Sequence, residues 1–165
     1  MFGRVPAIVD HAVSTQMGSV RLTERIRPSD PPSEDDLRAF EAMVEPHLDE
    51  VERTVPARDA RTLVAVAGTA TTLQACALGL ERYDPDLIHR STLTTADAER
   101  TLRELAAMTN AERAAIPVMP TGRGDVIVAG ASILVHAMRR FGSERALISE
   151  TDILDGLALE LLDVR

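Results

Sequence analysis

Leu63-Val-Ala-Val-Ala-Gly-Thr-Ala-Thr-Thr-Leu73 decides the fold of this chain, because an apolar run breaks at a glycine and continues as a threonine-rich apolar segment. This order is typical of a buried strand that leads straight into a helix. The first turn of a helix has backbone N–H groups without intrahelical partners, and its dipole adds positive potential, so phosphate is commonly held there. We expect Gly68 to allow close backbone approach and Thr69, Thr71 and Thr72 to add donors. The pattern also fits an ordinary tight turn with a threonine N-cap, which needs no ligand.

The composition indicates one globular domain over residues 1–165, with 45% hydrophobic residues. No apolar run reaches the roughly 18 residues of a membrane span, and the first residues lack the basic-then-apolar pattern of a signal peptide. We therefore expect a cytoplasmic protein without a membrane partner. Cys76 is the only cysteine and lies among alanine and leucine, as a buried core thiol would.

The charge pattern argues against DNA or RNA as a partner. The net charge is -8, whereas proteins that bind the phosphate backbone present a concentrated basic surface. All 18 positively charged residues are arginine, so a Walker-type phosphate lysine and a lysine Schiff base are excluded. Aromatic residues make up only 2% of the chain, which leaves little for stacking against bases.

Strand-like and helical segments alternate along the chain. β-branched residues predict extended segments over Val5 to Thr15 and Ser19 to Thr23, with a bend near Gly18. Ser33 and Asp36 form a capping-box pattern for a helix that Pro46 should kink or split. Further helices are predicted from about Thr71 to Gly79, after Thr94 or Thr95, after Asn110, from Val126 to about Phe141 and from Asp152, with a strand over Ala146 to Ser149. This order predicts an α/β fold, a mixed sheet faced by helices.

Two strand–helix junctions and one loop are expected to meet beside this sheet. Ligands of such sheets lie where strands end and helices begin. One junction is at Gly68 and the other runs from Ser149 to Asp152, while the loop through Arg123 could add a third wall. This convergence favours phosphate binding over a purely structural turn. We expect Arg123, Glu150 and Asp152 to be further cleft residues.

Metal-ligating patterns are weak in this sequence. Glu150 with Asp152 is the nearest candidate for Mg²⁺, since oxygen ligands suit that ion, but a helix N-cap explains Asp152 equally well. The histidines are too scattered to predict a zinc site, and we interpret them as surface or packing residues: His11, His47, His89 and His136.

Seven ordered motifs resemble the exopolyphosphatase/guanosine pentaphosphate phosphatase (Ppx/GppA) family, and most closely its actinobacterial branch. They cover almost the whole chain. The motifs are Gly18-Ser-Val-Arg-Leu-Thr-Glu-Arg25, Asp30-Pro-Pro32, Ala67-Gly-Thr-Ala-Thr-Thr-Leu73, Tyr83-Asp-Pro85, Thr109-Asn-Ala-Glu-Arg113, Asp125-Val-Ile-Val-Ala-Gly-Ala131 and Ser149-Glu-Thr-Asp-Ile-Leu-Asp-Gly156.

The resemblance implies one lobe of the actin-like, sugar-kinase-like ATPase fold, a ribonuclease H-like architecture in which two related lobes close over phosphates. Members of the family remove the terminal phosphate of polyphosphate or of guanosine pentaphosphate with Mg²⁺. On this likeness Gly68, Thr69 and Thr71 belong to the phosphate or nucleotide loop of the second lobe. Residues Glu150 to Gly156 would form another cleft-side turn.

The family's catalytic motifs are absent from this sequence. These are an Asp-x-Gly-Ser phosphate loop with a water-activating glutamate in the first lobe, and an Asp-x-Gly-Gly-Gly-Ser loop that opens the second lobe. Pro120-Thr-Gly-Arg123 also replaces the His-Pro-Gly-Arg expected of close relatives. The resemblance therefore predicts a second lobe that is incomplete at its N-terminus, and no catalytic residue is assigned.

Two main classes of function follow. The chain is either a phosphohydrolase lobe that is active only with a first-lobe partner, or a noncatalytic module that binds phosphate or nucleotide or self-associates. A gene fragment that still folds is a third alternative. Missing strands would leave an unpaired sheet edge, which favours a homodimer. The ligand stays open between polyphosphate, a guanosine nucleotide and another anion.

Overall fold

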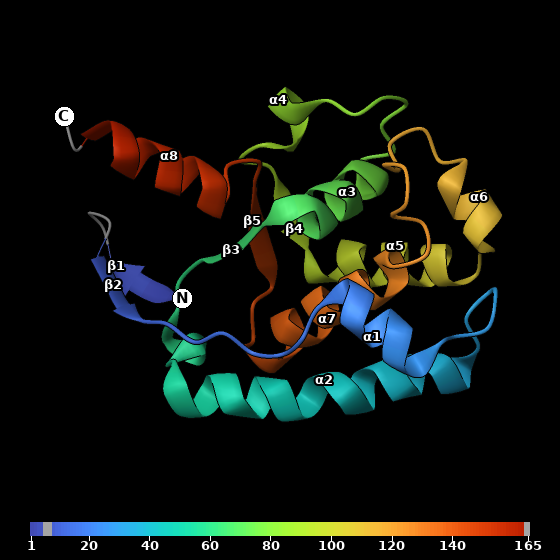
Figure 1. The fold of residues 1–165 in the computed structure, drawn as a ribbon, viewed down its shortest axis with the longest axis horizontal. Coiled ribbons are helices and arrows are strands. Elements are labelled where there is room, and N and C mark those ends of the chain that lie inside the picture. The colour runs from blue at the N-terminus through green and yellow to red at the C-terminus, as the bar shows by residue number, and fades with distance from the viewer. Residues whose placement is uncertain (5–7, 164–165) are drawn as a thin grey trace.

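In the computed structural model, which describes residues 1–4 and 8–163, helices pack on a small mixed sheet (Figure 1). The sheet contains β3 (Leu63–Val66), β4 (Thr92–Thr94) and β5 (Arg145–Ser149) in the order β3-β5-β4. Strand β3 runs parallel to β5, and β4 runs antiparallel to it. A separate antiparallel hairpin pairs β1 (Phe2–Arg4) with β2 (Ile8–His11). The predicted α/β class and mixed sheet are confirmed.

Strand β3 is buried on one face only. Ala65 and its partner Ile148 point into the core, because alternate residues of a strand face the same side. Val64 and Val66 lie on the opposite face and remain 50% and 47% exposed. The prediction of a buried strand therefore holds for one face and is wrong for the other, since an apolar run alone does not tell an edge strand from a central one.

Helix α7 (Ile127–Arg140), predicted from Val126 to about Phe141, lies at the centre of the helical layer. It contacts α1 (Ser19–Ile26), α2 (Glu34–Thr54), α3 (Ala67–Ala77) and α5 (Thr95–Ala106). The remaining helices are α4 (Pro85–Ile88), α6 (Asn110–Ala114), α8 (Ile153–Asp163) and the 3-10 helix η1 (Ala57–Asp59). Within residues 1–4 and 8–163, helices with both the length and the apolar character needed to cross a bilayer are absent.

The extended segment predicted over Ser19 to Thr23 is wrong, because these residues form helix α1. Leu22 is buried, and Ile26, one turn later, packs on the same core, so tertiary burial outweighs the β propensity of the valine and threonine. Of the first extended segment, Ile8–His11 is a strand and residues 12–15 are not. Val5, where that prediction began, lies outside the described residues.

Pro46 does not split α2, which continues from Glu34 to Thr54. Proline removes one helical hydrogen bond, but Pro46 itself faces solvent. Val44 and Leu48 on either side are fully buried, so packing holds the two halves in one helix. The capping box predicted from Ser33 and Asp36 is confirmed at its N-terminus.

Several helix starts differ from the predicted ones by a few residues. Helix α3 begins at Ala67 rather than near Thr71, because Ala67 adopts a left-handed φ of 68° and turns the chain from strand to helix at once. The cap of α6 is Thr109 rather than Asn110. Thr94 caps α5 as predicted, and it also ends β4, a strand that the sequence pattern did not indicate.

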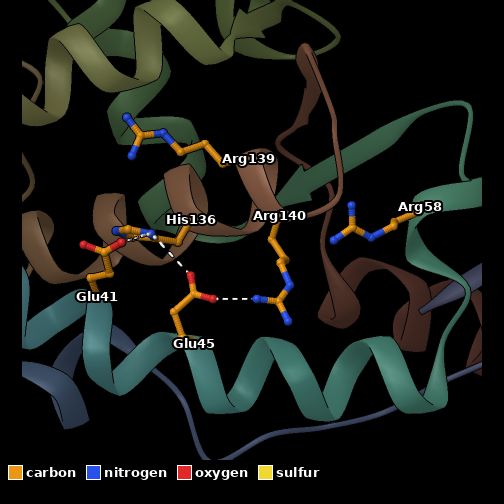
Figure 2. A pocket seen from close by; sticks show the side chains of 6 residues that line it. All are labelled: Glu41, Glu45, Arg58, His136, Arg139 and Arg140. Carbon is orange, nitrogen blue, oxygen red and sulfur yellow. Dashed lines mark hydrogen bonds and ion pairs between the residues drawn. The ribbon is translucent and has the colours of Figure 1, made fainter.

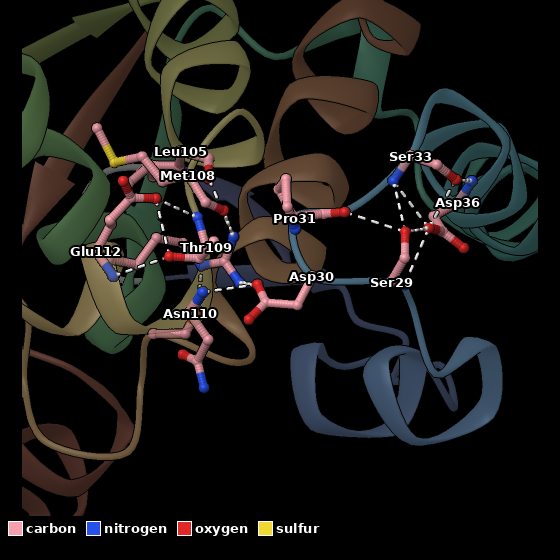
Figure 3. Close-up of polar contacts among 12 residues, drawn as sticks. Ser29, Asp30, Pro31, Ser33, Asp36, Leu105, Met108, Thr109, Asn110 and Glu112 are labelled. Atoms are coloured by element: carbon pink, nitrogen blue, oxygen red, sulfur yellow. Dashed lines mark hydrogen bonds and ion pairs between the residues drawn. The ribbon is translucent and has the colours of Figure 1, made fainter.

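The loop before α2 is tied to both α2 and α6 by carboxylates (Figure 3). The Asn110 backbone N–H donates to Asp30 Oδ1 at 2.7 Å. Asp36 Oδ2 accepts from the Ser29 hydroxyl at 2.7 Å and from the Ser33 N–H at 2.8 Å. These two bonds hold the pKa of Asp36 well below its ordinary value, and the bond from Ser29 has the larger effect.

We expect Asp36→Asn to lower the free energy of unfolding by about 1 kcal/mol at pH 7, the usual cost of a lost cap. A lowered native pKa stabilises the fold above the unfolded-state value of about 3.9, and this stabilisation is lost as the pH falls through the native value. The difference in unfolding free energy between wild type and Asp36→Asn should therefore shrink below about pH 4. Urea unfolding across this range measures it, with Asp35→Asn in the same helical turn as control. An equal loss in both variants would contradict the role of the cap.

Candidate functional site

The carboxyl ends of β3 and β5 lie side by side at one edge of the sheet. The parallel register pairs Val66 with Ser149, so the next residues of both strands leave the sheet together. The segment after β3 enters α3 through Ala67, and the segment after β5 continues through Glu150 towards α8. The two predicted junctions therefore meet, as the position of ligand sites in α/β sheets suggested.

The N-terminus of α3 has no side-chain cap. Its N-cap residue is Val66, whose side chain offers no hydrogen-bond acceptor, and the first turn contains no acidic residue. The positive end of this helix dipole is thus left to other partners. Thr71 and Thr72 are buried in this helix, and the Thr71 hydroxyl donates back to the Gly68 carbonyl at 3.4 Å.

The Arg123 guanidinium packs directly against Gly68. A Cβ added at Gly68 would lie 1.9 Å from Arg123 Nη1, so only glycine leaves room for the guanidinium in this position. Arg123 Nη1 also donates to the Thr72 hydroxyl at 3.4 Å. The backbone of Arg123 is fixed at the entrance of α7, because its carbonyl accepts from the Ile127 N–H at 2.9 Å. A positive side chain therefore lies on the positive end of a helix.

Tyr83 and Glu150 lie near the end of β5, whereas Arg123 meets Gly68 at the start of α3. The Tyr83 hydroxyl donates to Glu150 Oε1 at 2.6 Å, and the Glu150 N–H donates to His89 Nδ1 at 3.1 Å. Burial, and then the bond to Glu150, raise the pKa of Tyr83, while Thr71 and the charge of Arg123 act in the opposite direction. Tyr83 thus lies within reach of both halves of the cluster.

Two of the predicted site residues have structural partners instead of facing Arg123. Thr69 packs against α7, where a Cβ at Gly130 would lie 2.7 Å from Thr69 Cγ2 and 3.1 Å from Ser19 Cβ. Asp152 caps α8, since its Oδ1 accepts from the Leu154 N–H at 2.8 Å. Ser19 also lines a hollow of about 420 Å³ at the start of α1.

The structure therefore gathers Gly68, Thr71, Arg123 and Glu150 around Tyr83, and we call these five residues the junction cluster. Sequence reasoning did not place Tyr83 in this group. Its Tyr83-Asp-Pro85 segment was identified as one of the family motifs without a role at the site, although a lone tyrosine beside a turn was the available signal.

Glu150, the one carboxylate of the junction cluster, does not form a complete metal site. Among the described residues, the one group of three potential ligands within reach of a single ion lies elsewhere, between α2 and α7: Glu41, Glu45 and His136 (Figure 2). Glu150 bonds to Tyr83 and Asp152 caps a helix, so the pair proposed for Mg²⁺ does not fit a protein-only ligand set. Mg²⁺ does, however, commonly bind through one carboxylate together with substrate phosphates.

A profile of the Ppx/GppA phosphatase family matches residues 6–164, and this chain belongs to that family. It is 42% identical over 152 residues to exopolyphosphatase 2 of Mycobacterium tuberculosis, which covers 90% of this chain and 48% of that protein. An exopolyphosphatase-like crystal structure superposes with a TM-score of 0.90 at 35% identity, covering 93% of this chain and 51% of the other. The Ppx/GppA family member of Aquifex aeolicus gives a TM-score of 0.82 at 26% identity, covering 93% and 49%.

These likenesses confirm the predicted family and the actin-like ATPase fold. The chain spans about half the length of the first relatives that it matches.

Tyr83 makes the junction cluster directly measurable, because the chain has one tyrosine and no tryptophan. We expect Glu150→Gln to lower the pKa of Tyr83, since the charged acceptor that stabilises the phenol is removed. Arg123→Leu should raise it, because a nearby positive charge that favours the phenolate is lost. Titration of tyrosinate absorbance measures both, with Glu144→Gln at the other end of β5 as control. Unchanged titration in both site variants would separate these residues from Tyr83.

Proposed function

We propose that this chain is the phosphate-binding lobe of a Ppx/GppA-type phosphohydrolase and contacts the terminal phosphates of polyphosphate or of guanosine pentaphosphate. The observation that supports this most strongly is the Arg123 guanidinium packed on Gly68 at the uncapped N-terminus of α3. Two positive potentials side by side repel each other, whereas an anion between them is attracted by both. Arginine also binds phosphate through two parallel hydrogen bonds.

The junction cluster supplies only part of the chemistry of hydrolysis. In-line attack on a phosphoryl group needs donors around the transferring group and a residue that orients water. In this cluster Arg123 and the backbone amides of α3 provide donors. Glu150 is the one carboxylate present, and it is already bonded to Tyr83. We therefore propose that hydrolysis requires a first-lobe partner, and that this chain does not cleave phosphate on its own.

Mg²⁺ is the cofactor that we propose for the assembled enzyme. In such a site Glu150 would offer one oxygen ligand and the substrate phosphates would offer others, which is the usual way in which proteins hold this ion. When bound, the metal would neutralise phosphate charge.

We also propose a cytoplasmic location, which is consistent with a single cysteine. Burial raises the pKa of the Cys76 thiol to about 11, so this thiol is unreactive.

Self-association is the second candidate role, and the edge of the sheet favours it. Strand β3 is an edge strand with Val64 and Val66 about half exposed. Helix α8 extends away from the sheet (Figure 1) and exposes large apolar side chains around much of its circumference: Ile153, Leu154, Leu157, Leu159, Leu161 and Leu162. Apolar surface beside an open strand is typical of an interface. We propose a homodimer through this face.

Arg123→Gln should weaken binding of polyphosphate roughly tenfold to hundredfold, the range expected for hydrogen bonds to a charged group. Gly68→Val should have a similar effect, because the new side chain displaces the guanidinium. Gly68 does not adopt a left-handed φ, so valine is compatible with the backbone. Calorimetry with polyphosphate and with guanosine pentaphosphate measures the affinities, and phosphate release is followed in parallel.

Arg145→Gln is the matched control, since Arg145 lies at the opposite end of β5. Equal affinity in wild type, Arg123→Gln and Gly68→Val would remove the junction cluster from the binding site. Binding that never leads to hydrolysis, even with a first-lobe partner added, would favour the noncatalytic module.

Val64→Lys should shift the proposed dimer towards monomer, because a charge on the exposed face of β3 opposes strand pairing. Sedimentation velocity over a range of concentrations measures the mass. Glu34→Lys on the solvent side of α2 is a control that also adds positive charge. A monomeric wild-type chain at high concentration would contradict the proposed interface.

A further inference from the structure

Three potential metal ligands converge between α2 and α7, and we call them the α2–α7 triad. Glu41 and Glu45 are one turn apart on α2, and His136 comes from α7 (Figure 2). His136 Nδ1 lies 4.0 Å from Glu41 Oε1 and 3.7 Å from Glu45 Oε1. One ligand atom from each residue lies within 4.8 Å of the others.

His136 points into this triad without a hydrogen-bond partner. It is 9% exposed, and no hydrogen bond of its ring is found within the described part of the chain. The ring nitrogens are not sealed from solvent, because His136 lines an adjoining hollow, so an ion can reach them. Burial also lowers the pKa of His136, which favours the neutral imidazole that metal coordination needs.

The charges around the triad leave room for a cation. Arg140 pairs with Glu45 and Glu52 at 2.7 and 2.8 Å, and it also contacts Asp49. Glu41 has no arginine partner among the ion pairs of the described residues. The adjoining hollow is also lined by the guanidinium groups of Arg58, Arg139 and Arg140, so Glu41 is the carboxylate of the triad that is left for a cation.

We propose that Glu41, Glu45 and His136 bind a divalent transition-metal ion of the Zn²⁺ class. Bonds of about 2.0–2.2 Å in a tetrahedral site hold ligand atoms roughly 3.4 Å apart, so the two distances from His136 Nδ1, 3.7 and 4.0 Å, need to contract by a few tenths of an ångström. The two carboxylates, which lie within 4.8 Å of each other, must also turn towards the ion. The adjoining hollow of about 330 Å³ has space for a water molecule as the fourth ligand. Imidazole suits Zn²⁺, whereas Mg²⁺ prefers oxygen ligands alone.

The metal would join α2 to the central helix α7, and it would act separately from the phosphate site. His136 lies six residues beyond Gly130, which contacts α3. At 1.5 Å and 100° per residue this places it about 9 Å further along α7 and roughly 120° around it. The ion would therefore stabilise helix packing and take no part in phosphate binding.

The test is titration of the purified 165-residue chain with Zn²⁺ by calorimetry, together with Co²⁺ absorption and thermal unfolding. We expect one ion per chain, a rise of several degrees in Tm, and a visible Co²⁺ band typical of a four-coordinate nitrogen and oxygen site. His136→Ala and Glu41→Gln should each weaken Zn²⁺ binding at least tenfold and abolish the Tm rise. Excess Mg²⁺ should not displace the bound ion.

Two controls keep this result interpretable. Glu41 is exposed, so Glu41→Gln preserves the fold even if His136→Ala does not. His47→Ala removes a histidine of α2 that faces Glu50 alone at 3.9 Å, and it should leave Zn²⁺ binding unchanged. Absence of saturable Zn²⁺ binding, or equal binding by wild type and Glu41→Gln, would overturn the proposal. So would a loss in His47→Ala as large as that in His136→Ala.

Discussion

The parallel pairing of β3 with β5 is the constraint on which the rest of this structure depends. Because Val66 lies opposite Ser149, the chain leaves both strands at the same edge of the sheet. The pairing is held on its covered face by Ala65 and Ile148, which are buried under the helices. A shift of one residue in this register would turn those side chains outward and would separate the start of α3 from Glu150.

Electrostatics at that edge differ from those of the molecule as a whole. The chain carries a net charge of -8, yet Arg123 is held against the positive end of α3. Glu150 and Tyr83 face this positive group from the other strand end, so the cluster contains one negative and one positive side chain. Opposite charges at an open site bind an anion weakly until the carboxylate is recruited by a metal or turned away. For this physical reason we propose that these residues supply only half of a catalytic cleft.

Local rules predicted the elements whose ends carry capping signals. The capping box of α2, the Thr94 cap of α5 and the strand Leu63–Val66 all follow from short-range chemistry. The edge at which Gly68, Arg123 and Glu150 meet was also predictable, since parallel strands end together. Helix α1 was not predictable, because its β-branched residues favour a strand and only the burial of Leu22 in the core favours the helix.

Side-chain orientation was the main feature beyond reach of the sequence. Thr69 turns towards α7, which residue type alone does not show, and Asp152 caps α8, the alternative to metal binding that the sequence left open. The contact between Tyr83 and Glu150 joins residues 67 positions apart. The α2–α7 triad was missed for the same reason, since His136 meets Glu41 and Glu45 only after the helices pack.

Backbone amide shifts, followed by nuclear magnetic resonance as pyrophosphate is added to the isotope-labelled chain, test the anion-binding edge most directly. The account predicts that the largest shifts fall on the first turn of α3, at Gly68, Thr69 and Ala70, and on the residues just after β5. Shifts confined to another part of the chain would contradict it. So would the absence of any shift at pyrophosphate concentrations that are high enough for arginine-rich surfaces to bind phosphate.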